Sequence, residues 1–251
     1  MRTLAVIPAR LGATRLPRKP LRLLANLPLV VRVWQRVAAM SVAEHCVVAT
    51  DSEEVAQAVR AHGGHAVLTS SDHPSGTDRV AEVARRVEFA SFDAVVNVQG
   101  DEPFVSTQAV ERAAALVTAG RFPLATAAVR ATAAILDDPN VVKVVAADDQ
   151  RAMYFSRAPI PFLRDASDAA VQSERIWQHL GIYAYTRAAL EHWVALPVHP
   201  LEHIERLEQL RPLAAGVPIG VAVIDEPVRV GIDTEEDLER ANRDWTHFST
   251  G

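Results

Sequence analysis

The first half of the chain alternates short apolar runs with longer stretches whose apolar positions recur every three or four residues. The short runs have the length of buried strands and lie at Leu4–Ile7, His45–Thr50, His65–Leu68 and Asp93–Val98. Helical spacing follows them over Pro28–Met40, Ser52–His62, Val80–Val87 and Thr107–Ala119. Strands that alternate with helices predict an α/β fold with a doubly wound, mostly parallel, Rossmann-like sheet.

The rhythm changes after about residue 122. Apolar runs then follow one another with only turns between them, at Leu124–Val129, Val141–Ala146 and Ala152–Phe155, and a further strand is expected at Trp177–Tyr185. Consecutive strands predict an antiparallel excursion over about residues 122–185. No true linker separates it, so we expect one domain over residues 1–251, with the excursion contributing to a dimer interface.

The last part of the chain is expected to return to helix and strand. The spacing of Leu201, Ile204, Leu207 and Leu210 predicts one helix over residues 201–211, with Glu208 and Gln209 beside its apolar stripe and a solvated face of Glu202, Glu205 and Arg206. A strand at Ile219–Val223 and an extended segment over Val228–Asp233 follow. Thr234 and Asp237 have the spacing of a capping box, which predicts a final helix through about Trp245.

Positive charge gathers in one loop directly after the first strand, at Arg10, Arg15, Arg18 and Lys19. An open α/β sheet binds ligands at the carboxyl ends of its strands, so this loop predicts a polyanionic ligand, with a nucleoside triphosphate as the obvious candidate. The loop contains neither G-x-x-x-x-G-K-[ST] nor G-x-G-x-x-G. A solvated basic turn is the alternative.

Composition narrows the range of partners. The 251 residues carry a formal net charge of −5, which disfavours nucleic acid and anionic membranes and, with one basic loop, favours a small anionic ligand. The N-terminus enters a strand without a signal segment, and no apolar run has membrane-spanning length, so we expect a cytoplasmic protein. Cys46, the single cysteine, is expected to fill the core rather than act as a nucleophile.

Two carboxylates are candidate metal ligands. Asp101 follows the fourth strand, in Gln99-Gly100-Asp101-Glu102-Pro103. A carboxylate opposite a phosphate-binding loop indicates Mg²⁺, and a turn aspartate that caps the next element is the alternative. Asp233 precedes Thr234 and is either a second ligand or a helix N-cap; its spacing leaves that choice open.

Three weaker signals stand beside these carboxylates. Ser75-Gly76-Thr77 with Arg79 places small residues at a helix start, where backbone N–H groups can bind a ligand, although a simple helix cap fits better. A strand would put His179, Gly181, Tyr183 and Tyr185 on one face, which suits either a sugar or a structural histidine. His199 and His203 have a spacing compatible with zinc but lack a convincing third ligand.

Taken together, these stretches resemble the 3-deoxy-manno-octulosonate (KDO) cytidylyltransferase family nearly from end to end. The resemblance rests on the order and spacing of Ile7-Pro8-Ala9-Arg10, Thr14-Arg15-Leu16-Pro17, Lys19-Pro20, Ser75-Gly76-Thr77-Asp78-Arg79, Val96-Asn97-Val98-Gln99-Gly100-Asp101-Glu102-Pro103, Tyr154-Phe155-Ser156-Arg157, His179-Leu180-Gly181-Ile182-Tyr183, Leu207-Glu208-Gln209-Leu210-Arg211 and Gly231-Ile232-Asp233-Thr234.

The resemblance implies a nucleotidyltransferase that joins CMP from CTP to KDO for lipopolysaccharide synthesis, as a cytoplasmic homodimer. It implies Mg²⁺ on Asp101 and Asp233, and phosphate contacts from Arg10 and Lys19. The remaining nucleotide site would include Ala9, Arg15, Ser75, Gly76, Arg79 and Gln99. The sugar acid would be surrounded by Arg157, His179, Tyr183, Glu208 and Gln209.

Two departures from the family pattern matter. Arg18 stands where relatives usually have a small residue, and Asn26-Leu27 stand where the family commonly shows Gly-Lys before the proline. One hypothesis is that Arg18 replaces the missing lysine at the triphosphate. The alternatives in function are the same transfer to sialic acid or an 8-amino sugar, an aldose-1-phosphate nucleotidylyltransferase, which the missing glycine-rich loop disfavours, and a sensor that binds a sugar nucleotide without turnover.

Overall fold

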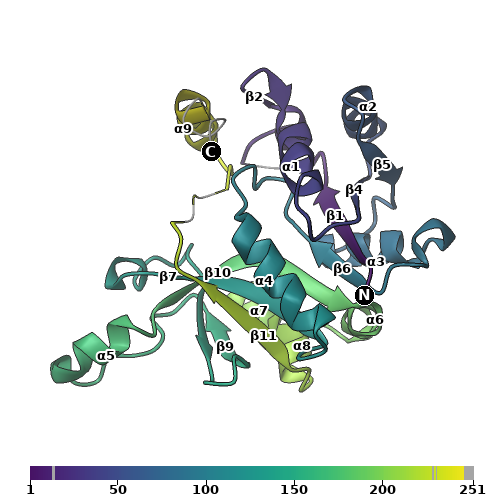
Figure 1. The fold of residues 1–251 in the computed structure, drawn as a ribbon. Helices are drawn as coiled ribbons and strands as arrows, with labels where there is room; N and C mark the ends of the chain where they lie inside the picture. Colours follow the sequence, from purple (N-terminus) through teal and green to yellow (C-terminus); the bar gives the residue numbers. More distant parts are fainter. Residues whose placement is uncertain (13–14, 228, 230, 246–251) are drawn as a thin grey trace. The chain divides into compact units, whose positions relative to one another are not determined.

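The computed structural model describes residues 1–12, 15–227, 229 and 231–245. Thr14 of the opening loop, and Val228 and Val230 of the expected extended segment, lie outside the described residues. The chain forms two compact units, shown in Figure 1: the first unit comprises residues 1–107 and 228–251, and the second comprises residues 108–227. Compact units within one chain need not be separate domains, so the single-domain expectation stays a prediction.

The first unit is built on parallel strands in the order β6 (Ala94–Asn97), β1 (Thr3–Ala9), β4 (His45–Thr50) and β5 (His65–Leu68). Every residue of β1 is buried, as expected for a central strand covered on both faces. Ala9 pairs with Thr50 and Val6 with Asn97, so the loops that follow these strands leave the same edge of the sheet. The predicted parallel strand pattern is confirmed for this unit.

The helices of the first unit are α1 (Leu29–Ala38), α2 (Glu53–Ala61), α3 (Gly76–Arg85) and α9 (Glu235–Asp244), with 3₁₀ turns η1 (Lys19–Leu21) and η2 (Val87–Phe89). Thr234 and Asp237 form the predicted capping box at the start of α9. Helix α3 begins four residues before the predicted Val80, because the Ser75 hydroxyl accepts from the backbone N–H of Asp78. Cys46 is buried, which confirms its place in the core.

A short hairpin in the first unit was not predicted. Strands β2 (Leu23–Leu24) and β3 (Leu27–Pro28) pair antiparallel around Ala25 and Asn26, whose φ angles are 48° and 66°. Two consecutive left-handed residues are the requirement of a type I′ turn, which ordinarily carries Asn-Gly. Because this turn contains no glycine, its usual sequence signal is missing. Asn26 fills the second position of the turn, and asparagine is the residue after glycine that best tolerates the left-handed conformation.

The second unit contains strands β7 (Leu124–Arg130), β8 (Lys143–Ala146), β9 (Ala152–Ser156), β10 (Trp177–Thr186) and β11 (Ile219–Ile224). β11 pairs parallel with β7, whereas the pairs β7–β10, β10–β8 and β8–β9 are antiparallel. The expected run of antiparallel strands is therefore present. Helices α4 (Thr107–Thr118), α5 (Ala169–Ser173) and α6 (Arg187–Ala195) and turns η3 (Ala133–Ile135) and η4 (Ala166–Asp168) accompany them.

The predicted single helix over residues 201–211 is wrong. The structure has two short helices there, α7 (Pro200–Glu205) and α8 (Leu210–Ala214), because Arg206 adopts a left-handed conformation with φ 55° and ψ 47°. Ile204 is 74% exposed, so the apolar stripe does not form. The solvated face is also wrong for Glu202, whose carboxylate accepts two hydrogen bonds of 2.7 Å from a buried Arg211.

Among the residues that the structure describes, no helix has both the length and the apolar character needed to cross a membrane.

Candidate functional site

The first unit brings an ammonium group between two carboxylates. The Nζ atom of Lys19 lies 2.6 Å from Oδ2 of Asp101 and 2.8 Å from Oδ1 of Asp233. Arg15 reaches the other oxygen of Asp233, with Nη2 3.1 Å from Oδ2. Lys19, Asp101 and Asp233 are called the cation centre below. Asp101 lies 82 residues and Asp233 lies 214 residues after Lys19 in the sequence, so the fold alone assembles this group.

Close backbone packing places Asp101. Gly100 follows the end of β6, and a Cβ atom at that position would lie 2.8 Å from the carbonyl oxygen of Pro8 and 3.3 Å from Cβ of Ala9. Any side chain would therefore push the loop away from the end of β1. The glycine lets the two strand ends approach, and the next residue, Asp101, turns toward Lys19.

The start of α9 places Asp233. Thr234 is the N-cap, so the helix does not use the side chain of Asp233 for that role, and a metal-ligand role for Asp233 stays a prediction. The carboxylate of Asp237 accepts from the backbone N–H groups of Asp233 and Thr234, at 3.1 and 3.0 Å. In addition, the N–H of Ile232 donates to the carbonyl of Asp101 at 2.9 Å. Backbone hydrogen bonds thus fix both carboxylate-bearing segments.

The charges of the centre perturb one another. Burial alone would lower the pKa of Lys19, but the neighbouring Asp101 and Asp233 carboxylates raise it above its ordinary value, so the ammonium stays charged. Glu102 behaves in the opposite way. Its burial, together with the negative charges of Asp101 and Asp233, raises its pKa to about 8. Room for this carboxyl exists because residue 231 is glycine; a Cβ there would lie 2.7 Å from Oε1 of Glu102.

The other cations of the opening loop have different surroundings. Arg10 is exposed, and none of the described acidic residues forms an ion pair with it. The guanidinium of Arg18 forms an ion pair with Glu54 at the start of α2. This contact provides Arg18 with a surface partner and weighs against the hypothesis that it replaces the missing lysine at the triphosphate.

The remaining nucleotide-site candidates surround the same sheet edge. Ala9 is the buried last residue of β1. Ser75 caps α3, and Gly76 opens it, close enough to Pro8 for an added Cβ to lie 3.4 Å from its ring. The carbonyl of Gln99 accepts from the N–H of Glu102 at 3.2 Å. Arg79 is buried, pairs with Asp51 at 2.9 Å and donates to Thr69, so its observed contacts tie α3 to the end of β4.

The second unit holds a polar–aromatic cluster of Thr126, Phe155, His179 and Tyr183. Nε2 of His179 lies 2.9 Å from Oγ1 of Thr126, and its ring packs edge-on against Phe155 at 5.0 Å and 5.6 Å from Tyr183. Burial lowers the pKa of His179 to about 3, so its imidazole is neutral. Burial, then the nearby Tyr185 and Glu208, raise the pKa of Tyr183, so its phenol also stays neutral. The structure therefore brings His179, Tyr183 and Glu208 near one another.

Gln209 carries an unsatisfied group. Its side chain is 3% exposed, and its Nε2 atom has no hydrogen-bond partner among the described residues. A buried amide without a partner destabilises a protein by about 1–3 kcal/mol. A ligand or an ordered water molecule can supply the missing acceptor.

Arg157 is occupied by the protein itself. Its guanidinium donates to the carbonyls of Glu205 and Pro139, at 2.8 Å each, and its backbone N–H donates to the Glu205 carboxylate at 2.9 Å. Glu205 also accepts from the hydroxyl of Ser156 at 2.6 Å. These contacts hold the left-handed turn at Arg206 that separates α7 from α8.

Sequence reasoning missed three residues. Glu102 gave no separate signal, because its importance depends on neighbours distant in the chain. Glu205 was expected on a solvated face, which is wrong, because its carboxylate accepts from the Ser156 hydroxyl and the Arg157 N–H. Lys143 did give one, since it is a lone lysine inside an apolar strand. It is fully buried, and its ammonium donates to the carbonyls of Asp138, Val141 and Arg157 at 2.6–3.0 Å. Lys143 thus supports the segment that presents Arg157.

The sequence is similar to those of known cytidylyltransferases. Residues 4–219 match the family model described as Cytidylyltransferase. The 3-deoxy-manno-octulosonate cytidylyltransferase of Gemmatimonas aurantiaca is 63% identical over 245 residues, covering 98% of this chain and 95% of the relative. That of Polynucleobacter necessarius is 46% identical, covering 96% of this chain and 94% of the relative.

Solved structures of related proteins have the same fold as this chain. The structure of CMP:2-keto-3-deoxy-manno-octonic acid synthetase complexed with CTP matches with a TM-score of 0.91 and 38% identity, over 99% of this chain and 100% of that one. A 4-diphosphocytidyl-2C-methyl-D-erythritol synthase from Anaerococcus prevotii matches with a TM-score of 0.64 at 14% identity, over 98% and 96% of the two chains, which is a likeness of fold. The predicted α/β nucleotidyltransferase fold is confirmed.

Proposed function

The chain belongs to the 3-deoxy-manno-octulosonate cytidylyltransferase family, and we therefore propose that it is an enzyme that transfers CMP from CTP to the anomeric hydroxyl of KDO. That hydroxyl oxygen attacks the α-phosphorus of CTP, the bond to the bridging oxygen breaks, and pyrophosphate leaves. The observation that carries the proposal is the cation centre, where Lys19 lies within 2.8 Å of both Asp101 and Asp233. Nucleotidyl transfer depends mainly on positioning and on neutralising charge, and this group serves both.

The cation centre fits Mg²⁺ as the cofactor. Asp101 and Asp233 offer hard oxygen donors, and the bridging ammonium is a stand-in cation that shows their oxygens converge on one positive charge. When bound there, Mg²⁺ would offset the negative charge that develops on the leaving pyrophosphate. Asp101 and Asp233 would hold the ion, with phosphate oxygens and water completing its ligands.

Lys19 would then exchange partners. An ammonium and a divalent cation cannot share the same pair of carboxylates at these distances, because like charges a few ångströms apart repel strongly. The triphosphate offers Lys19 new oxygen partners, so nucleotide binding would draw it from the carboxylates and leave them to the metal. Arg10, which is exposed, and Arg15 would contribute further phosphate contacts. Asp101 would also help to deprotonate the attacking hydroxyl.

The second unit supplies the groups for the sugar acid. His179 and Tyr183 are neutral, so each can exchange hydrogen bonds with sugar hydroxyls without the cost of burying a charge. The orphaned Nε2 of Gln209 offers a donor. Glu208 would accept from a hydroxyl. Arg157 would reach the sugar carboxylate by exchanging a backbone carbonyl contact for a charge-assisted one, which is stronger.

We further propose a homodimer formed through the excursion. Phe162 and Val171 are 80% and 66% exposed, and they line a hollow of about 620 Å³ in the second unit. Large exposed apolar side chains gathered in one place are typical of association surfaces. A second copy of the chain would cover them, and Phe162→Glu should yield a monomer in light scattering. A cytoplasmic location and a role in lipopolysaccharide synthesis are part of the same proposal.

A pyrophosphate-release assay with CTP, KDO and Mg²⁺ tests the proposed reaction. We expect release that requires all three components. Release with sialic acid or an 8-amino sugar, and little with KDO, would instead indicate the same chemistry on another acidic sugar. Tight CTP binding without release from any sugar acid would indicate a sensor.

A further inference from the structure

The three groups of the cation centre come from separate segments, which must be held in register. Lys19 lies on η1, Asp101 in the loop after β6, and Asp233 before α9. The hydrogen bond from Ile232 to Asp101 joins the second segment to the third. The segment that carries Lys19 runs directly into the β2–β3 hairpin, so the contacts of this hairpin decide how Lys19 is held relative to α9.

The hairpin is weak by itself. Each of its strands is two residues long, and its turn places Ala25 in a left-handed conformation that is unfavourable for a residue with a Cβ atom. Such a hairpin depends on contacts from other elements for its position. The buried Leu24 packs in a core cluster with Leu16, Leu29, Ile232, Leu238 and Ala241, and two polar side chains add directional contacts to the backbone of the hairpin.

Asn242, on the last turn of α9, pairs with the hairpin through both ends of its amide. Its Oδ1 atom accepts from the N–H of Ala25 at 2.8 Å, and its Nδ2 atom donates to the carbonyl of Leu23 at 3.1 Å. An amide side chain has the same donor and acceptor as a peptide group, so Asn242 acts as an extra ladder residue beside β2. A carboxylate could form only the first of these bonds.

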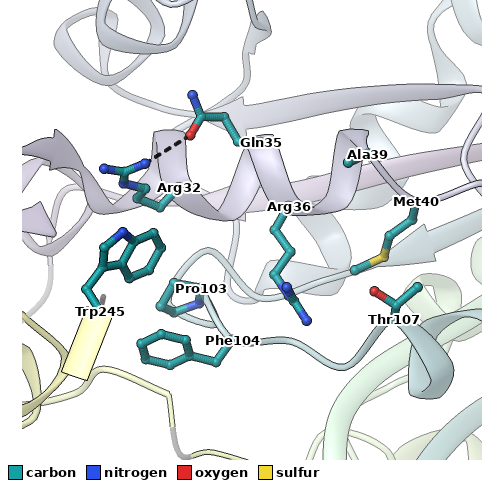
Figure 2. A pocket seen from close by; sticks show the side chains of 9 residues that line it. All are labelled: Arg32, Gln35, Arg36, Ala39, Met40, Pro103, Phe104, Thr107 and Trp245. Atoms are coloured by element: carbon teal, nitrogen blue, oxygen red, sulfur yellow. Dashed lines mark hydrogen bonds between the residues drawn. The ribbon is translucent and has the colours of Figure 1, made fainter. Parts of the chain in front are cut away.

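Arg32, on α1, holds the opposite side of the turn. Its Nε atom donates to the carbonyl of Leu24 at 3.1 Å, and its Nη2 atom donates to the carbonyl of Ala25. The same guanidinium lies 4.7 Å from the ring centroid of Trp245, directly after α9, and Figure 2 shows the two side chains beside each other. Arg32 therefore contacts both the hairpin and the end of the helix that Asn242 extends from.

We propose that Asn242 and Arg32 are positioning residues of the cation centre, which clamp the β2–β3 hairpin between α1 and α9. Through the hairpin they hold the Lys19 segment, and through α9 they hold Asp233, whose backbone is tied to the first turn of that helix by Asp237. The inference rests on the proposed role of Asp101 and Asp233 as cation ligands. It assigns a role in metal binding to two residues that do not contact the metal ligands.

Binding of Mn²⁺, counted by electron paramagnetic resonance without nucleotide, tests the clamp independently of turnover. The reference protein and every variant in this series carry Lys19→Gln, which removes the ammonium that competes with the metal ion for Asp101 and Asp233. Asn242→Ala should weaken Mn²⁺ binding about fivefold, and Asn242→Asp about twofold, because it keeps one of the two hydrogen bonds to the hairpin. Arg32→Lys should also weaken binding about fivefold, since a single ammonium cannot reproduce the fork of donors. Arg243→Ala is the matched control on α9, where Arg243 pairs weakly with Glu239 at 3.9 Å, and should bind Mn²⁺ as the reference protein does.

Thermal unfolding confirms that each variant is folded at the temperature of the titration. If Asp233→Asn weakens Mn²⁺ binding while folded Asn242→Ala and Arg32→Lys bind as the reference protein does, the clamp is wrong and the cation centre stands. If Asp233→Asn itself leaves Mn²⁺ binding unchanged, the proposed cation centre fails. Graded weakening in the order Asn242→Ala, Asn242→Asp, Arg243→Ala supports the clamp.

Discussion

Lys19 and His179 are both titratable groups in candidate binding sites, yet their surroundings act on them in opposite ways. Two carboxylates raise the pKa of Lys19 and keep it charged, whereas burial without a charged partner lowers the pKa of His179 to about 3 and keeps it neutral. The first unit thus carries a site built from opposed charges, and the second carries one built from neutral donors, acceptors and rings. This difference matches the ligands proposed for them, because a triphosphate needs cations and a sugar needs directional hydrogen bonds.

The largest effect is expected from removing a carboxylate of the cation centre in the first unit. Asp101→Asn and Asp233→Asn should each lower kcat by at least about 100-fold, because an amide oxygen is a poorer ligand for the cation that offsets negative charge at the reacting phosphate. Steady-state pyrophosphate release measures this. Both variants should retain wild-type circular dichroism, and near-normal kcat in a folded variant would exclude that residue as a ligand of the catalytic metal ion.

The next largest effect is expected from removing a neutral hydrogen-bond donor of the second unit. Gln209→Met keeps the side-chain volume but removes the unpartnered donor, so the KM for KDO should rise about tenfold or more while the KM for CTP stays unchanged. The same change should raise the free energy of unfolding by about 1 kcal/mol, because it removes a buried unsatisfied amide. Loss of stability together with an unchanged KM would show that the amide has a structural role.

A third prediction concerns pH. The pKa of Glu102 is raised from 4.5 to about 8 in the folded protein, so folding keeps a proton that the unfolded chain loses. The stability that this group contributes is fully present below about pH 4.5 and is lost as pH rises through 8. With a chelator present to remove metal ions, the free energy of unfolding of Glu102→Gln should therefore rise relative to that of wild type by at least about 1 kcal/mol between pH 5 and pH 9. Urea denaturation across this range measures it, and a constant difference would contradict the assigned environment.

The smallest effects sharpen the description of the opening segment. Arg18→Gly should leave the affinity for CTP within about twofold of wild type, because the guanidinium pairs with Glu54. It should also raise stability by about 0.5–1 kcal/mol, since residue 18 has φ 56° and glycine adopts that conformation without strain. Calorimetric titration with CTP checks the first expectation; a large loss of affinity would restore Arg18 as a phosphate contact.

The sequence predicted the parts of this structure that depend on local pattern. The strands around Val6, Val47 and Val96 and the cap at Thr234 follow from apolar runs and from residue spacing, and the structure has them. The sequence predicted that the basic loop and the two carboxylates belong to one site, but not that Lys19 contacts Asp101 and Asp233 directly. Residue spacing in the sequence does not give the distance between side chains of separate segments. The sequence could not predict the break at Arg206, since a helical stripe was present and the competing contacts come from Arg157, about fifty residues away.

The direct test of the central claim is a Mn²⁺ titration of wild type and Lys19→Gln, each with and without a non-hydrolysable CTP analogue. If the ammonium occupies the cation position, Lys19→Gln should bind Mn²⁺ more tightly than wild type without nucleotide, by about tenfold for one removed like charge. The analogue should then improve binding more in wild type than in the variant. Weaker or unchanged Mn²⁺ binding by a folded Lys19→Gln without nucleotide would contradict the account.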